Sequence, residues 1–341
     1  MATDLKLQPQ KSPPLNKSDT VFLDKYLGAF QDYLFEANVS EICVNKPGEI
    51  WIERMGVPVM ESGTNPLLTE EMLQRLARLV AEATGQKIGK ESPLLSATLP
   101  TGERIQFALP PASKNGVALS IRKQVVKDLS LNDYEKNGAF EKANIIREIE
   151  TDTSDNLLRE LAQNGKTNQF LSKAAKLKKN IIISGGTSTG KTTFLNAILK
   201  EIDDSERIIT IEDTPEVLPP QKNHLSLLAS KGGQGIAKVT IQDLLEASLR
   251  FRPDRILLGE LRGIEAYSFL RAVNTGHPGS ITTIHADTPK GALEQITLMV
   301  MQAGLGLSQD HIRQYITSII DIVVQLKRIG GKRIVSEIWY P

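Results

Sequence analysis

The chain has 341 residues, the apolar and charged fractions of an ordinary globular protein and a formal net charge of +1. This length favours two domains over one compact core, and the near-neutral charge gives no overall basic field that would indicate nucleic-acid binding. The single cysteine, Cys43, excludes an intrachain disulfide and a multi-cysteine zinc site, and we expect it to be a packing residue.

The N-terminal stretch, residues 1–18, is rich in proline, lysine and glutamine and predicts a disordered tail without the apolar segment of a secretory signal. From 19 to 38 apolar residues recur at helical spacing and predict one helix. Alternating residues around Pro47-Gly48 and Met55-Gly56 then predict a small antiparallel meander. These are the first elements of a mixed α+β domain.

A second amphipathic helix is expected from about Glu70 to Thr84, followed by strands in LLSATLP, ERIQFALPP and GVALSIRK. Helix, strands, helix and strands make an α+β domain over residues 19–126. The polar segment 127–155 is interpreted as a linker, and residues 156–341 as a second domain.

The second domain alternates helical patterns with the apolar segments NIIIS, RIITIE, HLSLLA, RILLGE, GSITTIH, DIVVQLK and RIVSEIWYP. This alternation predicts an α/β fold with a mostly parallel sheet. The richest apolar run, SIIDIVVQL near Ile319, is far shorter than the ~20 residues that cross a bilayer and is interpreted as a buried strand. We therefore expect a cytoplasmic protein, or one that reaches a membrane through a partner.

The stretch GGTSTGKT fits the phosphate-binding pattern G-x-x-x-x-G-K-[ST] between a strand and a helix. Glycines allow backbone N–H groups to turn inward around an anion, and the helix N-terminus adds positive potential. Lys191 is expected to reach the β- and γ-phosphates of ATP, and the Thr192 hydroxyl to ligate Mg²⁺. The expected nucleotide-binding residues are Gly185, Gly186, Thr187, Ser188, Thr189, Gly190, Lys191, Thr192 and Thr193.

Acidic residues follow two other apolar strands, where parallel sheets present ligands at their carboxyl ends. Glu212 ends RIITIE and Asp213 follows it directly, and Glu260 ends RILLGE. We expect Glu260 to position or activate the attacking water, and Thr192 and Glu260 to be the protein groups at the metal ion. For Asp213, a surface acid that caps a strand is an equal alternative.

Two histidines lie in TGHPGSITTIHAD. His285 ends a strand in the layer expected to face the phosphates and is a candidate sensor of the γ-phosphate. For His277, functional and structural roles are equally open. His224 and His311 have no neighbours that indicate a role.

The motifs GGTSTGKT, RIITIEDTPE, RPDRILLGELRG and TGHPGSITTIHA, in this order, resemble the secretion-ATPase superfamily. Its members carry a Walker A loop, an acidic Asp box, an atypical Walker B strand that ends in Gly-Glu, and a His box. Within it, the chain resembles the VirB-type traffic ATPases of type IV secretion systems. A single cysteine cannot supply the zinc motif typical of pilus-assembly and type II export ATPases, and the C-terminal GGKRIVSEIWYP lacks the helical signature of retraction ATPases.

The resemblance implies a RecA-like ATPase domain and a homohexamer whose N-terminal and C-terminal domains stack as two rings, with the nucleotide between them. It implies that N-domain arginines reach the γ-phosphate, and the matching positions are Arg104 and Arg122. A guanidinium fork suits the developing charge on phosphoryl oxygens. The expected catalytic set is Lys191, Glu212, Glu260, His285, Arg104 and Arg122, with Arg250, Arg252 and Arg262 as further candidates for contacts across a subunit boundary.

The implied function is ATP hydrolysis that energises substrate transfer and pilus biogenesis at the cytoplasmic face of a bacterial inner membrane. Implied partners are inner-membrane and cytoplasmic components of the apparatus, including other secretion ATPases and the coupling protein. The cluster Lys173, Lys176, Lys178 and Lys179 is interpreted as a solvated helix face, with a peripheral membrane contact as the alternative.

Three other functions stay open. One is a pilus-retraction or type II secretion-like motor. The second is a nucleotide-gated assembly switch whose turnover is incidental. The third is a DNA-translocating ring, although no basic, aromatic-bearing loop marks one and direct nucleic-acid binding is not evident.

Overall fold

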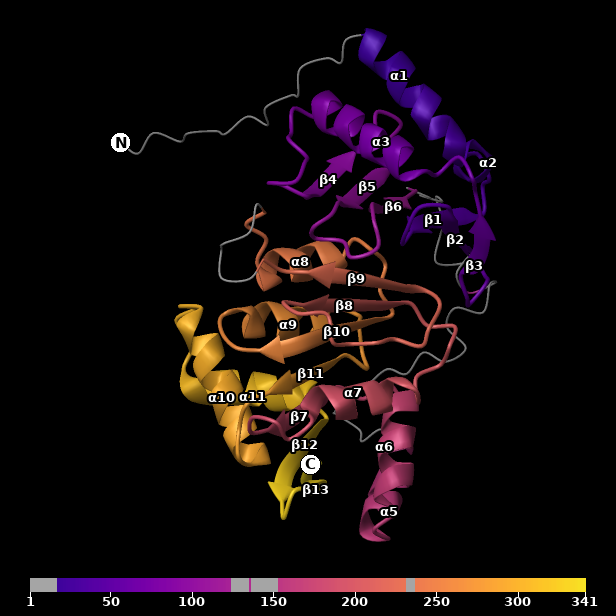
Figure 1. Ribbon diagram of the computed structural model, residues 1–341. Coiled ribbons are helices and arrows are strands. Elements are labelled where there is room, and N and C mark those ends of the chain that lie inside the picture. Colours follow the sequence, from indigo (N-terminus) through magenta and orange to yellow (C-terminus); the bar gives the residue numbers. More distant parts are fainter. Residues whose placement is uncertain (1–16, 124–134, 136–152, 231–236) are drawn as a thin grey trace.

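The computed structural model describes residues 17–123, 135, 153–230 and 237–341 (Figure 1). In this part of the chain the strands form two sheets, each with its own helices, and one module lies above the other. The predicted fold class, an α+β module before a mostly parallel α/β module, is confirmed. The expected tail and linker fall almost wholly outside the described residues, apart from α5, which begins at Thr153, so the domain bounds stay a prediction.

The N-terminal module is built on an antiparallel sheet of order β3-β2-β1-β6-β5-β4. Two helical segments lie across it, α1 to α2 and α3 (Figure 1). The strands are β1 (Val39–Val44), β2 (Glu49–Arg54), β3 (Glu61–Thr64), β4 (Leu94–Thr98), β5 (Arg104–Ala108) and β6 (Ala118–Arg122). The helices are α1 (Lys17–Leu27), the 3-10 turn η1 (Gly28–Phe30), α2 (Gln31–Leu34) and α3 (Glu70–Ala83).

Helix α3 begins where predicted, because the Thr69 hydroxyl accepts a hydrogen bond from the Met72 N–H at 3.2 Å. The single helix predicted over 19–38 is wrong: the chain tightens into η1 after α1. This break buries Phe30 together with Leu23 and Leu27 in the module core. The third strand of the meander, expected directly after Met55-Gly56, lies later in the chain, at β3.

The second module is built on a sheet of order β13-β12-β7-β11-β10-β8-β9, in which β13 alone among the described strands pairs antiparallel. The strands are β7 (Ile181–Gly185), β8 (Ile208–Glu212), β9 (His224–Leu228), β10 (Arg255–Leu261), β11 (Ile281–Ile284), β12 (Ile322–Ile329) and β13 (Lys332–Trp339). The helices are α5 (Thr153–Gln163), α6 (Thr167–Lys176), α7 (Lys191–Leu199), α8 (Ile241–Ser248), α9 (Glu265–Asn274), α10 (Pro289–Gln302) and α11 (Gln309–Ile319).

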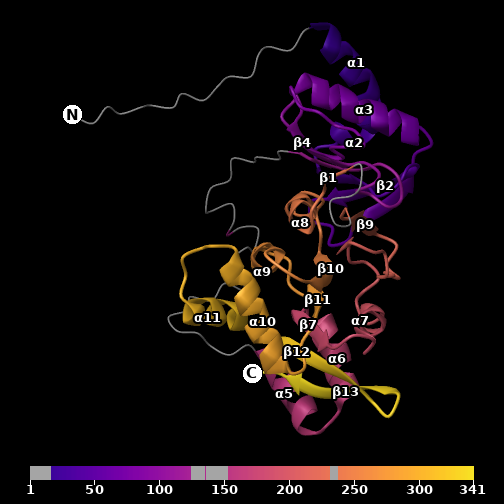
Figure 2. The same ribbon diagram turned by 60° about the vertical axis from the view of Figure 1, so that its left-hand side comes forward.

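Both faces of this sheet are covered, which explains its near-continuous apolar strands. Helices α8–α11 lie on one side of the sheet and α5–α7 on the other (Figure 2). Ile182 of β7 packs in the core on the α8–α11 side, whereas its neighbours Ile181 and Ile183 pack on the α5–α7 side. The strand expected in SIIDIVVQL starts only at Ile322, because Ile319 still belongs to α11. The parallel order brings the carboxyl ends of β7, β8, β10 and β11 to one edge of the sheet.

The N-terminal module lies against the β9 edge of the second sheet (Figure 1). Ser113 bridges Leu227 in antiparallel fashion, and the Leu228 N–H donates to the Ala112 carbonyl at 2.8 Å. Buried amides join the modules as well, since Asn45 Nδ2 donates to Asn223 Oδ1 at 3.1 Å. Among the helices described, none has the length and apolar character needed to span a membrane.

Candidate nucleotide site

The phosphate-binding loop lies between β7 and α7, as predicted. Gly190 caps α7 with φ +89°, a conformation that favours glycine. A Cβ at Gly185 would meet the Leu326 carbonyl at 2.9 Å, so this position has no room for a side chain. The first N–H groups of α7 lack helical partners and carry the positive end of the helix dipole. The loop is therefore shaped to receive an anion.

Lys191 is held in the loop by its own carbonyl groups. Its Nζ donates to Gly185 O at 2.9 Å and Gly186 O at 3.2 Å, and lies 3.4 Å from both ring nitrogens of His285. Burial lowers the pKa of the Lys191 ammonium, although the nearby Glu260 carboxylate opposes the shift. A cation in this position can contact the phosphates of a nucleotide.

Glu260 lies at the same edge, between the His285 ring and the Arg262 guanidinium. Its Oε1 is 3.0 Å from His285 Nε2, and its Oε2 accepts Arg262 Nη2 at 2.7 Å. Arg262 Nη1 also donates to Asp213 Oδ2 at 2.6 Å. The Glu260 hydrogen bond is the main reason that the pKa of Arg262 is raised. The predicted residues at the ends of β8, β10 and β11 thus meet beside the loop. Arg262 contacts two carboxylates of its own chain.

Glu212 reaches this edge too, but its carboxylate has a different environment. It is 3 % exposed, and its Oε1 accepts the N–H groups of Glu216 and Val217, each at 2.8 Å. Burial raises the pKa of this carboxyl, although the two backbone donors oppose the shift. Glu212 therefore shapes the loop that carries Asp213, whereas Asp213 is the residue that contacts Arg262.

These groups line a cavity of about 410 Å³, which is within the size range of small-ligand sites. Thr187 to Thr193 form one wall, and Thr283 and Arg333 are also part of the lining. Within the described residues there is no cluster of three or more His, Cys, Asp or Glu side chains that could hold a metal ion. The donors fit Mg²⁺ only in its usual nucleotide form, with a hydroxyl, one or two carboxylates and phosphate oxygens.

Arg333 was not predicted from the sequence. It comes from β13 and lies so close to the loop that a Cβ at Gly190 would be 2.9 Å from its Cδ. It is exposed, and within the described part of the chain no hydrogen bond or ion pair is found for its guanidinium. Lys191 and Arg262 are both engaged, so Arg333 is the cation here that still lacks a partner. Only the pairing of β12 with β7 brings β13 to the loop, and no local pattern reveals that pairing.

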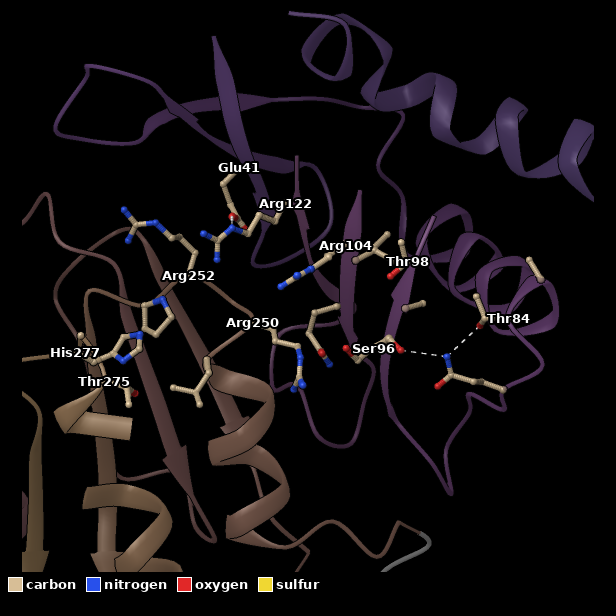
Figure 3. A pocket seen from close by; sticks show the side chains of 18 of the residues that line it. Glu41, Thr84, Ser96, Thr98, Arg104, Arg122, Arg250, Arg252, Thr275 and His277 are labelled. Carbon is tan, nitrogen blue, oxygen red and sulfur yellow. Dashed lines mark hydrogen bonds and ion pairs between the residues drawn. The ribbon is translucent and has the colours of Figure 1, made fainter. Parts of the chain in front are cut away.

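Arg104 and Arg122 lie elsewhere, in a cavity of about 1100 Å³ between the two modules (Figure 3). Its floor includes Leu249, Arg250, Arg252 and Pro253 before β10, and Thr275–His277 before β11. These are the amino ends of parallel strands, whereas the loop follows the carboxyl end of β7. A single chain therefore does not bring either arginine to its own phosphate-binding loop.

The remaining candidates have surroundings within their own chain. His277 Nδ1 is 2.9 Å from the Ala272 carbonyl, and Arg252 Nε donates to Glu53 Oε1 at 3.0 Å, while Arg250 lines the larger cavity. Burial raises the pKa of the Cys43 thiol to about 11, in keeping with a packing role. In the lysine cluster, Lys176, Lys178 and Lys179 pair with Glu201, Glu206 and Asp321.

Comparisons with known proteins identify the family and agree with the fold. The family model described as "Type II/IV secretion system protein" matches residues 27–336. Type IV secretion system protein VirB11 of Bartonella henselae is 42 % identical over 324 residues, 90 % of each chain, and PtlH of Bordetella pertussis is 39 % identical over 93 % of this chain and 95 % of that one. The crystal structure of the VirB11 ATPase of Brucella suis with sulphate superimposes with a TM-score of 0.88 at 35 % identity, covering 95 % of both chains.

Proposed function

The chain belongs to the type II/IV secretion system protein family, and we propose that it is an ATPase that energises a bacterial type IV secretion system. The observation that carries the proposal is the contact series at the phosphate-binding loop, in which Lys191, His285 and Glu260 follow one another within 3.4 Å and 3.0 Å. Phosphoryl transfer to water requires a cation that contacts the phosphates and a carboxylate that can accept a proton from water.

In this proposal the loop N–H groups and Lys191 bind the phosphates of ATP, and Thr193 lies near the α-phosphate. Glu260 orients the attacking water and accepts its proton, while His285 and Arg262 hold the carboxylate from either side. Glu212 supports the loop of Asp213. Mg²⁺, held by Thr192, the phosphates and Glu260, would neutralise charge on the transferred group.

Arg104 and Arg122 act on the nucleotide of a neighbouring subunit in this proposal. The two arginines lie across a cavity from the amino ends of the parallel strands of the second sheet, whereas the loop lies at their carboxyl ends. These two ends of the sheet face in opposite directions. A closed ring of identical subunits places such surfaces against each other. A homohexamer would thus complete each site across a boundary and make the contact between subunits depend on the bound nucleotide.

We place the ring at the cytoplasmic face of the inner membrane, with other secretion ATPases, the coupling protein and inner-membrane components of the apparatus as partners. The support is the likeness to proteins named as type IV secretion components.

One observation favours a second candidate, the nucleotide-gated assembly switch. The Glu260 carboxylate is occupied on both oxygens, by His285 and by Arg262. An occupied base is compatible with a site that binds nucleotide and turns it over only when a partner frees the carboxylate.

The test is phosphate release by the purified full chain over a protein-concentration series, with Lys191→Ala, Glu260→Gln and the control Lys200→Ala. Lys200 is exposed at the far end of α7 and lines no part of either cavity. The motor predicts turnover that rises as rings assemble, loss of binding in Lys191→Ala, and binding without turnover in Glu260→Gln. Tight ATP binding without phosphate release at any concentration would leave the switch as the better account.

A further inference from the structure

Charged residues form one row across four strands of the N-terminal sheet. Arg104 of β5 lies opposite Arg122 of β6, Arg122 lies opposite Glu41 of β1, and Glu41 lies opposite Glu53 of β2. Residues directly opposite one another share a face of the sheet. The row ends at the second module, because Glu53 accepts the Arg252 guanidinium. In this row, the two arginines proposed to contact phosphate are followed by the two carboxylates of Glu41 and Glu53.

Glu41 is the fixed member of this row and Arg122 the adjustable one. Glu41 is 3 % exposed and its Oε1 accepts the Ser120 hydroxyl, whereas the Arg122 side chain is 69 % exposed. Glu41 Oε2 lies 4.0 Å from Arg122 Nε, too long for a direct hydrogen bond. Figure 3 shows the two side chains beside each other at the wall of the larger cavity. An arginine held this loosely can turn to another anion without breaking a close pair.

We propose that Glu41 is a positioning residue for Arg122, and that it takes up a proton from solvent when the larger cavity receives a phosphate-bearing group; this inference rests on the proposed phosphate contact of Arg122. A phosphate at Arg122 replaces Glu41 as the partner of the guanidinium. It also places a second negative charge near a carboxylate that is already removed from water. The proton neutralises Glu41 and returns to solvent when the phosphate leaves.

The resting protonation state of Glu41 makes this exchange accessible near neutral pH. Burial raises the pKa of its carboxyl to about 7, although the Ser120 hydrogen bond and the Arg122 charge oppose the shift. A further rise when phosphate arrives therefore changes the average charge of Glu41 in the physiological range. Below about pH 7 the carboxyl is already neutral, and Arg122 is free to meet the ligand.

Most other groups facing Glu41 keep a constant charge under these conditions. Arginine side chains are always protonated in proteins, and the raised pKa of Cys43 keeps its thiol neutral. Among the described lining residues His277 is the one histidine, and substitution of its ring separates its contribution from that of Glu41. The groups around Glu41 and its cavity are Arg104, Arg122, Arg207, Arg250, Arg252, Glu53, Cys43 and His277.

The experiment compares KM for MgATP between about pH 6 and about pH 8 in the assembled wild type and in the Glu41→Gln, Ser120→Ala and His277→Gln variants. We expect the wild-type KM to rise about tenfold relative to that of Glu41→Gln over this range, because glutamine mimics the protonated carboxyl at every pH. Ser120→Ala should move the rise to higher pH, since it removes a donor to the charged form. His277→Gln should keep the wild-type profile.

A second measurement does not depend on turnover. Calorimetry of MgATP binding in two buffers of different ionisation enthalpy gives the protons taken up, which should be more for wild type than for Glu41→Gln at about pH 7.5. Parallel KM profiles together with equal proton uptake would overturn the inference while leaving the proposed function intact. Proton uptake without phosphate release would instead remove the proposed function and keep the inference.

Discussion

The carboxylate of Glu260 and the guanidinium of Arg262, two residues apart in sequence, form an ion pair in which Arg262 Nε and Nη2 donate to the same oxygen at 3.0 and 2.7 Å. Because Arg262 also reaches Asp213, it fixes the direction of the Glu260 side chain. Without this fork, His285 alone would hold the Glu260 carboxylate, which could then turn toward the Lys191 ammonium and compete with the phosphates.

Arg262→Ala should lower kcat about tenfold, less than the ~10²–10⁴-fold loss expected when a general base is removed. Arg262→Lys should recover only part of the loss, because lysine lacks the planar fork. Steady-state phosphate release checks this, with Arg271→Ala, a surface arginine stacked on Tyr267, as the control. An Arg262→Ala variant faster than wild type would show that the pair restrains the base instead of positioning it.

Arg333→Ala should raise KM for ATP about tenfold and leave kcat within about twofold, since a charge-assisted contact to phosphate contributes about 1.5 kcal/mol. This expectation rests on the position of the Arg333 side chain, which lies against Gly190 of the loop. The adjacent Lys332→Ala variant is the matched control, because successive side chains of a strand point to opposite faces. Equal effects of the two substitutions on KM would indicate a general loss of positive charge.

Glu41→Gln should stabilise the protein at alkaline pH and leave it unchanged in acid. The pKa of Glu41 is about 7 when folded against an ordinary 4.5, so its contribution is fully present below about pH 4.5 and is lost as pH rises through about 7. At about pH 8 the variant should exceed wild type by about 3 kcal/mol. Urea unfolding at several pH values measures this, and a constant difference across pH would contradict it.

Asn223→Ala should destabilise the junction of the modules by about 3 kcal/mol, because it removes the acceptor that two buried donors share. Its Oδ1 accepts both Asn45 Nδ2 and the guanidinium of Arg207, which is fully buried. Urea midpoints should fall for Asn223→Ala and stay constant for the exposed neighbour Lys222→Ala. Equal midpoints for the two variants would mean that the buried amide network contributes little.

The sequence predicted the parts of the site whose geometry is local or follows from parallel strand ends. Gly185 to Thr192 are contiguous and flanked by a strand and a helix, and Glu260 and His285 follow strands that share one sheet edge. The family resemblance and the fold class built on these motifs are confirmed. A site built from residues that are contiguous in sequence or that end parallel strands can therefore be predicted from one sequence.

Other features depend on which strands lie side by side, and this the sequence does not state. Arg333 reaches the loop only because β12 pairs with β7 and carries β13 with it. Arg104 and Arg122 match the family pattern, but their cavity at the opposite sheet edge requires the docking of two modules. The break at η1 was missed because apolar spacing does not distinguish a straight helix from two that bury Phe30.

The bridge between Ser113 and Leu227 also covers an edge strand that could otherwise pair with a second copy of the chain. The backbone of β9 would otherwise end the large sheet with unpaired N–H and C=O groups beside the apolar Leu225 and Leu227. A shortened chain that begins near Thr153 would uncover this strand and offer it to a second sheet. Such a fragment should self-associate through β9, so biochemical work on isolated ATPase modules needs residues 112–114 or a substitute for them.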